Sequence, residues 1–203
     1  MRTVLQRVKS ASVTVDGQLI SSIGQGLLVL AAISKDDTEK DVESMASKIL
    51  KAKLWDDTDK DPPAKWKKCV PDIGGEVLCV SQFTLLASIK KGNKPDFHLS
   101  ANGDKARVLY QSFFKKVQTL YEPEKVKDGL FAAMMDVALV NDGPVTIQID
   151  TNPPKMEDPT NLGPSGAGTP GSSTASTTVD VNDLVNNMTR ITKEFQIPAE
   201  LLE

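Results

Sequence analysis

The alternation of apolar and polar positions in the first part of the chain predicts several strands. Short runs rich in β-branched residues cover 4–8, 11–15 and 19–23, and Asp16-Gly17 between the last two is a strong hairpin signal. The continuous apolar run 26–33 has the length of a strand and predicts one that is buried on both faces. We therefore expect an opening meander that leads into a central strand.

Two later segments repeat apolar residues at helical spacing. Thr38 and Asp41 resemble a capping box, and one face of the following helix is apolar, comprising Val42, Met45, Ala46, Ile49 and Ala52. Asn102 is a suitable N-cap for a second helix, whose apolar face comprises Ala106, Leu109, Tyr110, Phe113, Val117 and Leu120. Both helices are expected to pack against the sheet.

The rest of the first 150 residues completes an α+β pattern. A polar, proline-bearing excursion over 56–63 precedes a strand at 76–81. Apolar residues alternate over 135–139 and again over 145–149, on either side of Asn141-Asp142-Gly143, which predicts a closing hairpin. Strands interrupted by two separate helices indicate an α+β domain of layered sheets over residues 1–150.

The composition changes after residue 150. Pro, Gly, Ser and Thr occupy 18 of the 28 positions from 152 to 179, which predicts a disordered linker over 151–179. Within 180–203, apolar residues recur at helical spacing behind Asp180 until Pro198, which predicts a short amphipathic helix. That helix either packs on the protein's own core or binds a partner.

Composition and charge exclude several classes of protein. No apolar run approaches the length of a membrane span, and the first residues do not resemble a secretory leader, so we expect a cytoplasmic protein without membrane attachment. Two cysteines and one histidine in 203 residues cannot assemble a zinc cluster or a disulfide framework. The net charge of −3 arises in the tail, where 7 Asp+Glu face 3 Lys+Arg after residue 150. We expect neither a metal nor an organic cofactor.

Three places are candidates for chemistry. Ser81-Gln82-Phe83-Thr84-Leu85 follows a predicted strand and is either a ligand-binding strand end or an ordinary strand edge. Pro144, next to a turn, presents carbonyl groups outward or simply closes the turn. The lone histidine, His98, is either a general base or a surface residue.

Four motifs together resemble those of D-aminoacyl-tRNA deacylases, in that family's order and spacing. They are Gln6-Arg7-Val8 with Ala11 to Val15, Ser81 to Leu85, Lys91-Gly92-Asn93-Lys94-Pro95-Asp96-Phe97, and Asn141-Asp142-Gly143-Pro144-Val145-Thr146. The resemblance covers about residues 1–150. It implies a homodimeric esterase that removes D-amino acids, and to some extent glycine, from tRNA as quality control in translation.

The resemblance also implies roles for individual residues. Ser81, Gln82, Phe83 and Thr84 form the catalytic segment and, with Leu85, line a pocket for the terminal adenosine and the scissile ester. A cis Gly143-Pro144 peptide enters the partner subunit's pocket and leaves no room for an L side chain. The other substrate-binding positions are Arg7, which orients this loop, and Phe131, Met135 and Asn141. The candidates for tRNA phosphate contacts are Lys90, Lys91 and Lys94, and also Lys65, Lys67 and Lys68 unless these three are only solvated surface.

An aminoacyl ester is already activated, so N–H donors that stabilise the tetrahedral oxyanion can supply much of the rate. Thr84 is then either a covalent nucleophile or a positioning residue, and we favour positioning, with the substrate's ribose 2′-hydroxyl assisting attack by water. A competing hypothesis is an adaptor that binds nucleic acid or protein through the acidic tail and its helix.

Overall fold

The computed structural model describes residues 1–89 and 92–153, and Met1–Lys155 forms one compact unit. The expected helix at 180–203 and all but the first three residues of the expected linker lie outside the described residues, as do Lys90 and Lys91. Among the described helices, none combines the length and the apolar character needed to cross a membrane.

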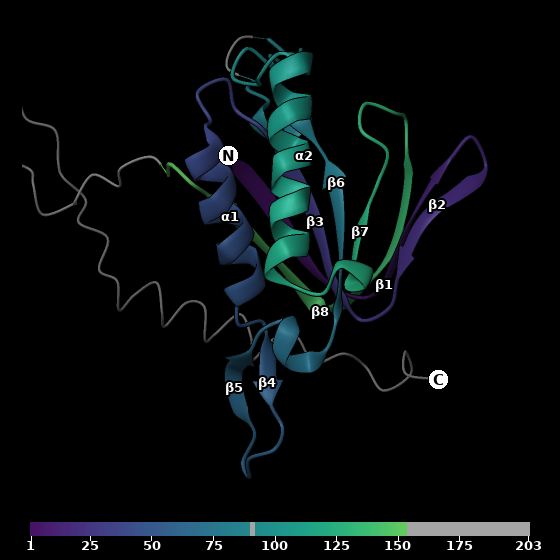
Figure 1. Ribbon diagram of the computed structural model, residues 1–203, viewed down its shortest axis with the longest axis vertical. Coiled ribbons are helices and arrows are strands. Elements are labelled where there is room, and N and C mark those ends of the chain that lie inside the picture. Colours follow the sequence, from purple (N-terminus) through teal and green to yellow (C-terminus); the bar gives the residue numbers. More distant parts are fainter. Residues whose placement is uncertain (90–91, 154–203) are drawn as a thin grey trace, which may run out of the picture. The chain divides into compact units, whose positions relative to one another are not determined.

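The sheet is built around its first strand, β1 (Arg2–Val15), which pairs with three antiparallel neighbours. These are β2 (Gln18–Ile23), β3 (Gly26–Ala32) and β8 (Asp136–Asp150). Beyond β3 the sheet continues in parallel through β6 (Glu76–Ser81) and β7 (Val126–Asp128). Hydrogen bonds link the strands in the path β2-β1-β3-β6-β7, in which β2 and β3 pair with different halves of β1. β8 lies outside this path and pairs with both halves of β1 along its opposite edge (Figure 1).

The expected meander is wrong in one respect. The two strands predicted at 4–8 and 11–15 are halves of the single strand β1, whose first half pairs with β3 and whose second half pairs with β2. β2 and β3 therefore lie along the same edge of β1 and do not pair with each other. The alternation of side chains shows that a segment is a strand, but it carries no information on which strand lies beside it.

The expected closing hairpin is also wrong. Residues 136–150 form one strand, β8, and both of its halves pair with β1. Asn141 lies opposite Val8 and Val145 lies opposite Arg7, so residues 142–144 bulge out of the ladder. The turn-forming residues thus make a bulge and no chain reversal, because the long edge of β1 provides partners for both halves of β8.

Both helices form at the predicted positions. α1 (Glu39–Lys51) begins at Thr38, whose N–H donates to the Asp41 carboxylate at 3.0 Å, and α2 (Gly103–Leu120) begins at Asn102, whose side chain accepts from the Lys105 N–H at 2.9 Å. The two helices lie side by side on one face of the sheet (Figure 1). At the end of the second helix the predicted apolar face is not buried, since Leu120 is 48% exposed.

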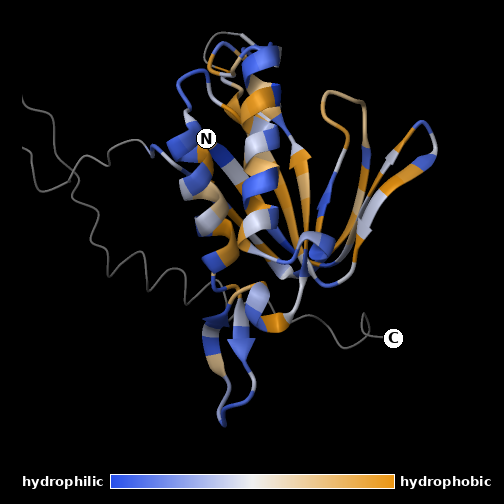
Figure 2. Ribbon diagram, in the orientation of Figure 1, coloured by the Kyte–Doolittle hydropathy of each residue, from blue (hydrophilic) through white to orange (hydrophobic). Residues whose placement is uncertain are grey.

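The central strands are made largely of hydrophobic residues (Figure 2), and two apolar clusters cover their two faces. One lies between the helices and the sheet and includes Leu5, Val29 and Phe113. The other lies on the opposite face, where Leu28 and Val80 pack against Val137 and Leu139 of β8. β3 is buried almost throughout, which confirms the prediction from its continuous apolar run, and the α+β class is confirmed as well.

The remaining elements are short. The polar excursion over 56–63 is the tip of a two-stranded sheet that the pattern did not predict, formed by β4 (Trp55–Asp57) and β5 (Ala64–Lys68). Within the described residues, three 3₁₀ turns connect the larger elements: η1 (Pro71–Ile73), η2 (Phe83–Leu86) and η3 (Pro123–Lys125). Of these, η2 follows β6 after Gln82 and contains Phe83 and Thr84 of the candidate catalytic segment.

Candidate active site

The segment from Ser81 to Leu85 turns sharply at the end of a buried strand. β6 ends at Ser81, which is paired with Ala31 of β3, and the Gln82 N–H donates to the Ala31 carbonyl oxygen at 2.8 Å. The chain then enters η2, where the Leu85 N–H donates to the Gln82 carbonyl oxygen at 3.2 Å. The end of the sheet thus determines where this turn begins.

Two backbone donors of this turn are available to a ligand. The first N–H groups of a helical turn have no carbonyl partner within the turn itself. Among the described residues, neither the Phe83 N–H nor the Thr84 N–H has a hydrogen-bond acceptor. Adjacent donors of this kind are suited to binding a developing oxyanion.

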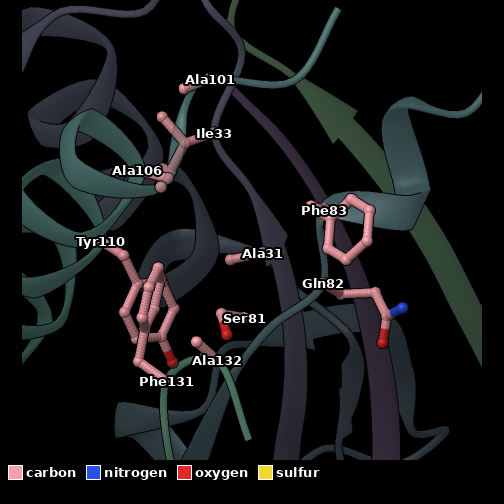
Figure 3. Close-up of a pocket in the computed structure, with 11 residues that line it drawn as sticks. Ala31, Ile33, Ser81, Gln82, Phe83, Ala101, Ala106, Tyr110, Phe131 and Ala132 are labelled. Atoms are coloured by element: carbon pink, nitrogen blue, oxygen red, sulfur yellow. The ribbon is translucent and has the colours of Figure 1, made fainter. Parts of the chain in front are cut away.

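Two cavities meet at this segment. The first, of about 370 Å³, reaches from Ser81, Gln82 and Phe83 to α2 and Phe131. Figure 3 shows the rings of Tyr110 and Phe131 on one side of this cavity and Gln82 and Phe83 on the other. Its lining is mostly apolar and aromatic, which suits a flat ring system that stacks between side chains.

The second cavity, of about 490 Å³, lies against the same strand end. Its lining includes Ser81 to Thr84 and also Met134 and Met135. Ala132 lines both cavities, so the strand-end turn and the loop before β8 separate them. Ser81, Gln82 and Phe83 also line both cavities, so a ligand with two parts can occupy both with its central group beside this turn.

Within the turn, the side-chain amide of Gln82 contacts the hydroxyl group of Thr84 and donates to it. No carboxylate or imidazole in the described part of the chain hydrogen-bonds to this hydroxyl. A hydroxyl that accepts a hydrogen bond and has no neighbouring base is a poor nucleophile. The geometry therefore favours a positioning role for Thr84.

The aromatic wall of the first cavity is fixed by a buried polar pair. The Tyr110 hydroxyl donates to the Asp128 carboxylate at 2.6 Å, and burial raises the pKa of both groups. The Tyr110 ring packs on Phe131 with 5.5 Å between centroids, and the Arg107 guanidinium lies 4.8 Å from the Phe131 ring centroid. Tyr110 and Arg107, both on α2, therefore fix the position of the Phe131 ring in the cavity wall.

The Gly143-Pro144 segment is tied to Arg7. The Arg7 Nε donates to the Asp142 carbonyl oxygen at 3.0 Å and lies 3.2 Å from an Asp142 carboxylate oxygen, while its Nη1 donates to the Leu54 carbonyl oxygen. The Gly143-Pro144 peptide is cis, and Gly143 has φ +127°, where a Cβ would lie 2.9 Å from the Val145 side chain. Only glycine fits this position without strain.

Within one chain, this loop and the strand-end turn are not brought together. Arg7 is paired with Leu27, which is paired with Val77, and Val77 lies four residues before Ser81 on β6. At about 3.3 Å per residue, this separates them by roughly 13 Å along the strands. Neither cavity at the turn is lined by Arg7, Gly143 or Pro144.

The other predicted residues divide between the site and the surface. Phe131 lines the first cavity and Met135 the second, whereas Asn141 lines neither: it lies opposite Val8 on β1, and its side chain accepts from the Gln6 side-chain amide at 3.5 Å. His98 is exposed to solvent, its imidazole contacts the Asp96 carboxylate, and it lines neither cavity. Lys94 is exposed. Lys65 and Lys68 are paired with carboxylates of their own hairpin, while Lys67 is exposed.

Sequence reasoning missed several residues of the site. Tyr110 was expected only as a packing residue of α2, and no role was expected for its partner Asp128 or for Ala132. Asp142 belonged to a quoted motif, but its contact with Arg7 was not foreseen. Tyr110 and Asp128 come from different elements and meet only in the folded chain. For Tyr110, the one available signal was a hydroxyl group on an otherwise apolar helix face.

The fold and the site define an α+β protein with a largely apolar double cavity around a strand-end turn. A family model described as D-Tyr-tRNA(Tyr) deacylase matches residues 4–150, so the chain belongs to that family. The chain is 58% identical over 152 residues to the D-aminoacyl-tRNA deacylase of Yarrowia lipolytica, which is 74% of this chain and 97% of that protein. It is 47% identical over 154 residues to human D-aminoacyl-tRNA deacylase 1, which is 76% of this chain and 72% of that protein.

Solved structures share the fold. One titled c-Myc DNA Unwinding Element Binding Protein superimposes with a TM-score of 0.70 at 46% sequence identity, covering 75% of this chain and all of the other. A second, titled as a probable eukaryotic D-amino acid tRNA deacylase, has a TM-score of 0.64 at 17% identity and covers 73% of this chain and 97% of the other. The second structure is similar in fold alone.

Proposed function

We propose that this protein hydrolyses the ester bond of D-aminoacyl-tRNA, and of glycine mischarged on a non-cognate tRNA, releasing the free amino acid and tRNA. The observation that carries the proposal is the strand-end turn: Ser81, Gln82 and Phe83 line both cavities, and the Phe83 and Thr84 N–H groups have no acceptor among the described residues. In this reaction the terminal adenine occupies the first, aromatic cavity and the ester carbonyl lies at the two donors. Membership of the D-Tyr-tRNA(Tyr) deacylase family supports the substrate class.

The chemistry requires little from ionisable side chains. Water attacks the ester carbonyl with help from the ribose 2′-hydroxyl, negative charge develops on the carbonyl oxygen, and the Phe83 and Thr84 N–H groups stabilise it. Thr84 and Gln82 position the ester without forming a covalent intermediate, in keeping with the hydrogen bond between their side chains. Neither a metal nor an organic cofactor takes part.

Rejection of L-aminoacyl-tRNA is proposed to depend on a second subunit. The Gly143-Pro144 loop lies far from the turn of its own chain, so in a homodimer it enters the partner's site. Its carbonyl oxygens accept hydrogen bonds from the substrate's α-ammonium group, and its bulk excludes an L side chain. Exclusion by backbone discriminates more strongly than a pocket that senses one methylene group, which is worth about 1–3 kcal/mol.

The acceptor end of the tRNA is proposed to lie across Lys94, with Lys90 and Lys91 beside it in sequence, and the reaction to take place in the cytosol. Lys65 and Lys68 are weaker candidates because carboxylates of the same hairpin neutralise them. Each phosphate contact that is lost should reduce the dependence of binding on salt concentration.

The test is a deacylation assay on tRNA charged with D-tyrosine, L-tyrosine or glycine, with the purified full-length protein. We expect release of D-tyrosine at least about 100-fold faster than release of L-tyrosine, because a steric clash excludes the L side chain. Spontaneous hydrolysis without protein provides the baseline. Equal rates for the two enantiomers, or rates at the baseline, would refute the proposal.

A further inference from the structure

Arg2 connects the far end of the domain to the candidate catalytic turn. Its Nε donates to the Asp150 carboxylate at 2.8 Å, and its Nη1 donates to the Leu85 carbonyl oxygen at 3.0 Å. Arg2 and Asp150 are also register partners of β1 and β8. The guanidinium is therefore held in place from β8 while it contacts η2.

The contact with Leu85 differs from the other hydrogen bonds of the turn. The carbonyl oxygens of Gln82 and Thr84 each accept from the backbone N–H group three residues further along, and that of Phe83 accepts from the Ser100 hydroxyl at 3.3 Å. Among the described donors to carbonyl oxygens 82–85, only Arg2 carries a charge. A charged donor makes a stronger hydrogen bond than a neutral one and fixes the acceptor's peptide plane more tightly.

We infer that Arg2 is a positioning residue for the deacylation reaction: it fixes the orientation of η2, and thereby of the Phe83 and Thr84 N–H groups that stabilise the oxyanion. This inference rests on the proposed function. Misdirected donors weaken stabilisation of the transition state more than binding of the ground state. Loss of the Arg2–Leu85 hydrogen bond should therefore lower kcat and leave KM nearly unchanged.

Arg2→Lys separates this role from simple stabilisation. A lysine ammonium group is a point charge that pairs with Asp150 but lacks the planar fork that reaches both partners. The variant should keep the melting temperature of the wild type while its kcat falls about tenfold, as expected for loss of one charge-assisted hydrogen bond. Asp150→Asn should cause a smaller fall in kcat, and adding it to Arg2→Gln should cause no further loss, because Asp150 acts through Arg2.

Lys116→Met is the matched control. It removes another partly exposed ion pair, in which Lys116 lies 2.8 Å from Glu43, and this pair joins α2 to α1 away from the site. This variant should keep the wild-type kcat. A kcat for Arg2→Lys within twofold of the wild type, or equal losses in Arg2→Lys and Lys116→Met, would overturn the inference.

A second measurement does not depend on turnover. Hydrogen exchange of the Leu85 and Ala87 amides, which are hydrogen-bonded within the turn, should be at least about tenfold faster in Arg2→Lys than in the wild type, with α1 and α2 unchanged. If the wild type failed to deacylate D-aminoacyl-tRNA, the proposed function would be wrong, and exchange would still decide whether Arg2 orients the turn. Unchanged exchange of the Leu85 and Ala87 amides would refute the positioning role.

Discussion

Thr84 lies at the centre of the candidate active site, and its neighbours restrict what its hydroxyl group can do. The hydroxyl accepts from Gln82, and the described residues provide it with no base. If Thr84 only positions the ester, Thr84→Ala should lower the rate of D-aminoacyl-tRNA hydrolysis by about tenfold, the value of one hydrogen bond. Steady-state kinetics measure the loss, and acid quenching of the wild type should trap no acyl-enzyme.

The alternative to a positioning role is that Thr84 is a covalent nucleophile. A folded Thr84→Ala variant with no activity above the baseline, together with an ester trapped on the wild type, would establish covalent catalysis. Ser12→Ala, which removes a hydroxyl from β1, serves as the control for the loss of a hydroxyl elsewhere.

The raised pKa of the Asp128 carboxyl group predicts how the stability of the fold depends on pH. Burial raises the pKa of its carboxyl group above the unfolded value, although the Tyr110 hydroxyl opposes the rise. The folded state therefore binds this proton more tightly, so the carboxyl group contributes stability that is complete below about pH 4, the ordinary pKa of aspartate, and is lost as pH rises through the raised pKa. Asparagine keeps an acceptor for Tyr110 but does not titrate.

The prediction concerns the difference in unfolding free energy between the wild type and Asp128→Asn. This difference should favour the wild type most at low pH and should shrink as pH increases from 4 to 8. Urea denaturation at several pH values measures it, and Asp16→Asn in the exposed β1–β2 turn is the control. A difference that is constant with pH, or that grows with it, would show that Asp128 has no raised pKa.

At the scale of elements, the bulge at residues 142–144 depends on one side chain. Arg7 binds both the backbone and the carboxylate of Asp142 and is itself held by the Leu54 carbonyl oxygen. Arg7→Ala removes these contacts, so the loop should lose its fixed orientation while β1 and β8 stay paired. The ratio of D- to L-tyrosine release should fall by at least about tenfold, the value of one hydrogen bond to a charged donor.

Kinetics on both enantiomers, with circular dichroism to confirm folding, measure the effect of Arg7→Ala. Lys9→Ala, an exposed change on the same strand, should leave the ratio unchanged. An unaltered ratio in a folded Arg7→Ala variant would show that another part of the molecule recognises the stereocentre.

At the scale of the whole molecule, the separation of the loop from the strand-end turn leads to a test of the homodimer. Arg7→Glu replaces the ion pair with Asp142 by repulsion between two carboxylates, which disables the loop. Ala132→Trp places a large side chain where the two cavities meet. Each variant alone should be nearly inactive. Randomly mixed subunits should recover roughly a quarter of the wild-type activity, because about half of the dimers have one intact site in two.

Mixing is done by unfolding and refolding the two variants together, and variants refolded separately are the control. Activity of the mixture that merely equals the mean of the two separate variants would mean that each chain forms its own complete site. A monomer in sedimentation equilibrium would contradict the dimer directly.

The adaptor hypothesis is also tested at this scale. Residues 151 and 152 are tied to the domain, since the Thr151 N–H donates to the Met1 carbonyl oxygen at 3.0 Å and the Asn152 side chain donates to Asp41 at 3.2 Å. Truncation after Pro153 should therefore keep the melting temperature and leave the deacylation rate within about twofold of that of the full chain. Loss of folding or of activity would show that the tail belongs to the core or to the site.

The local features of the fold were determined by the sequence itself. Helix caps at Thr38 and Asn102, the continuous apolar run of β3 and the strand that ends at Ser81 all depend on residues a few positions apart. Such features follow from the periods of helix and strand and from the propensities of single residues, so the pattern alone predicts them.

Only the tertiary structure decided which distant segments meet. It placed both halves of β8 on β1, the Tyr110 hydroxyl on Asp128, and Arg7 on a residue 135 positions away. Likewise, Arg2 reaches Leu85 across 83 positions. These contacts depend on which strand edges and side chains are left to be paired once the core has packed, and a local pattern does not encode that choice because many pairings satisfy the same alternation of apolar and polar residues.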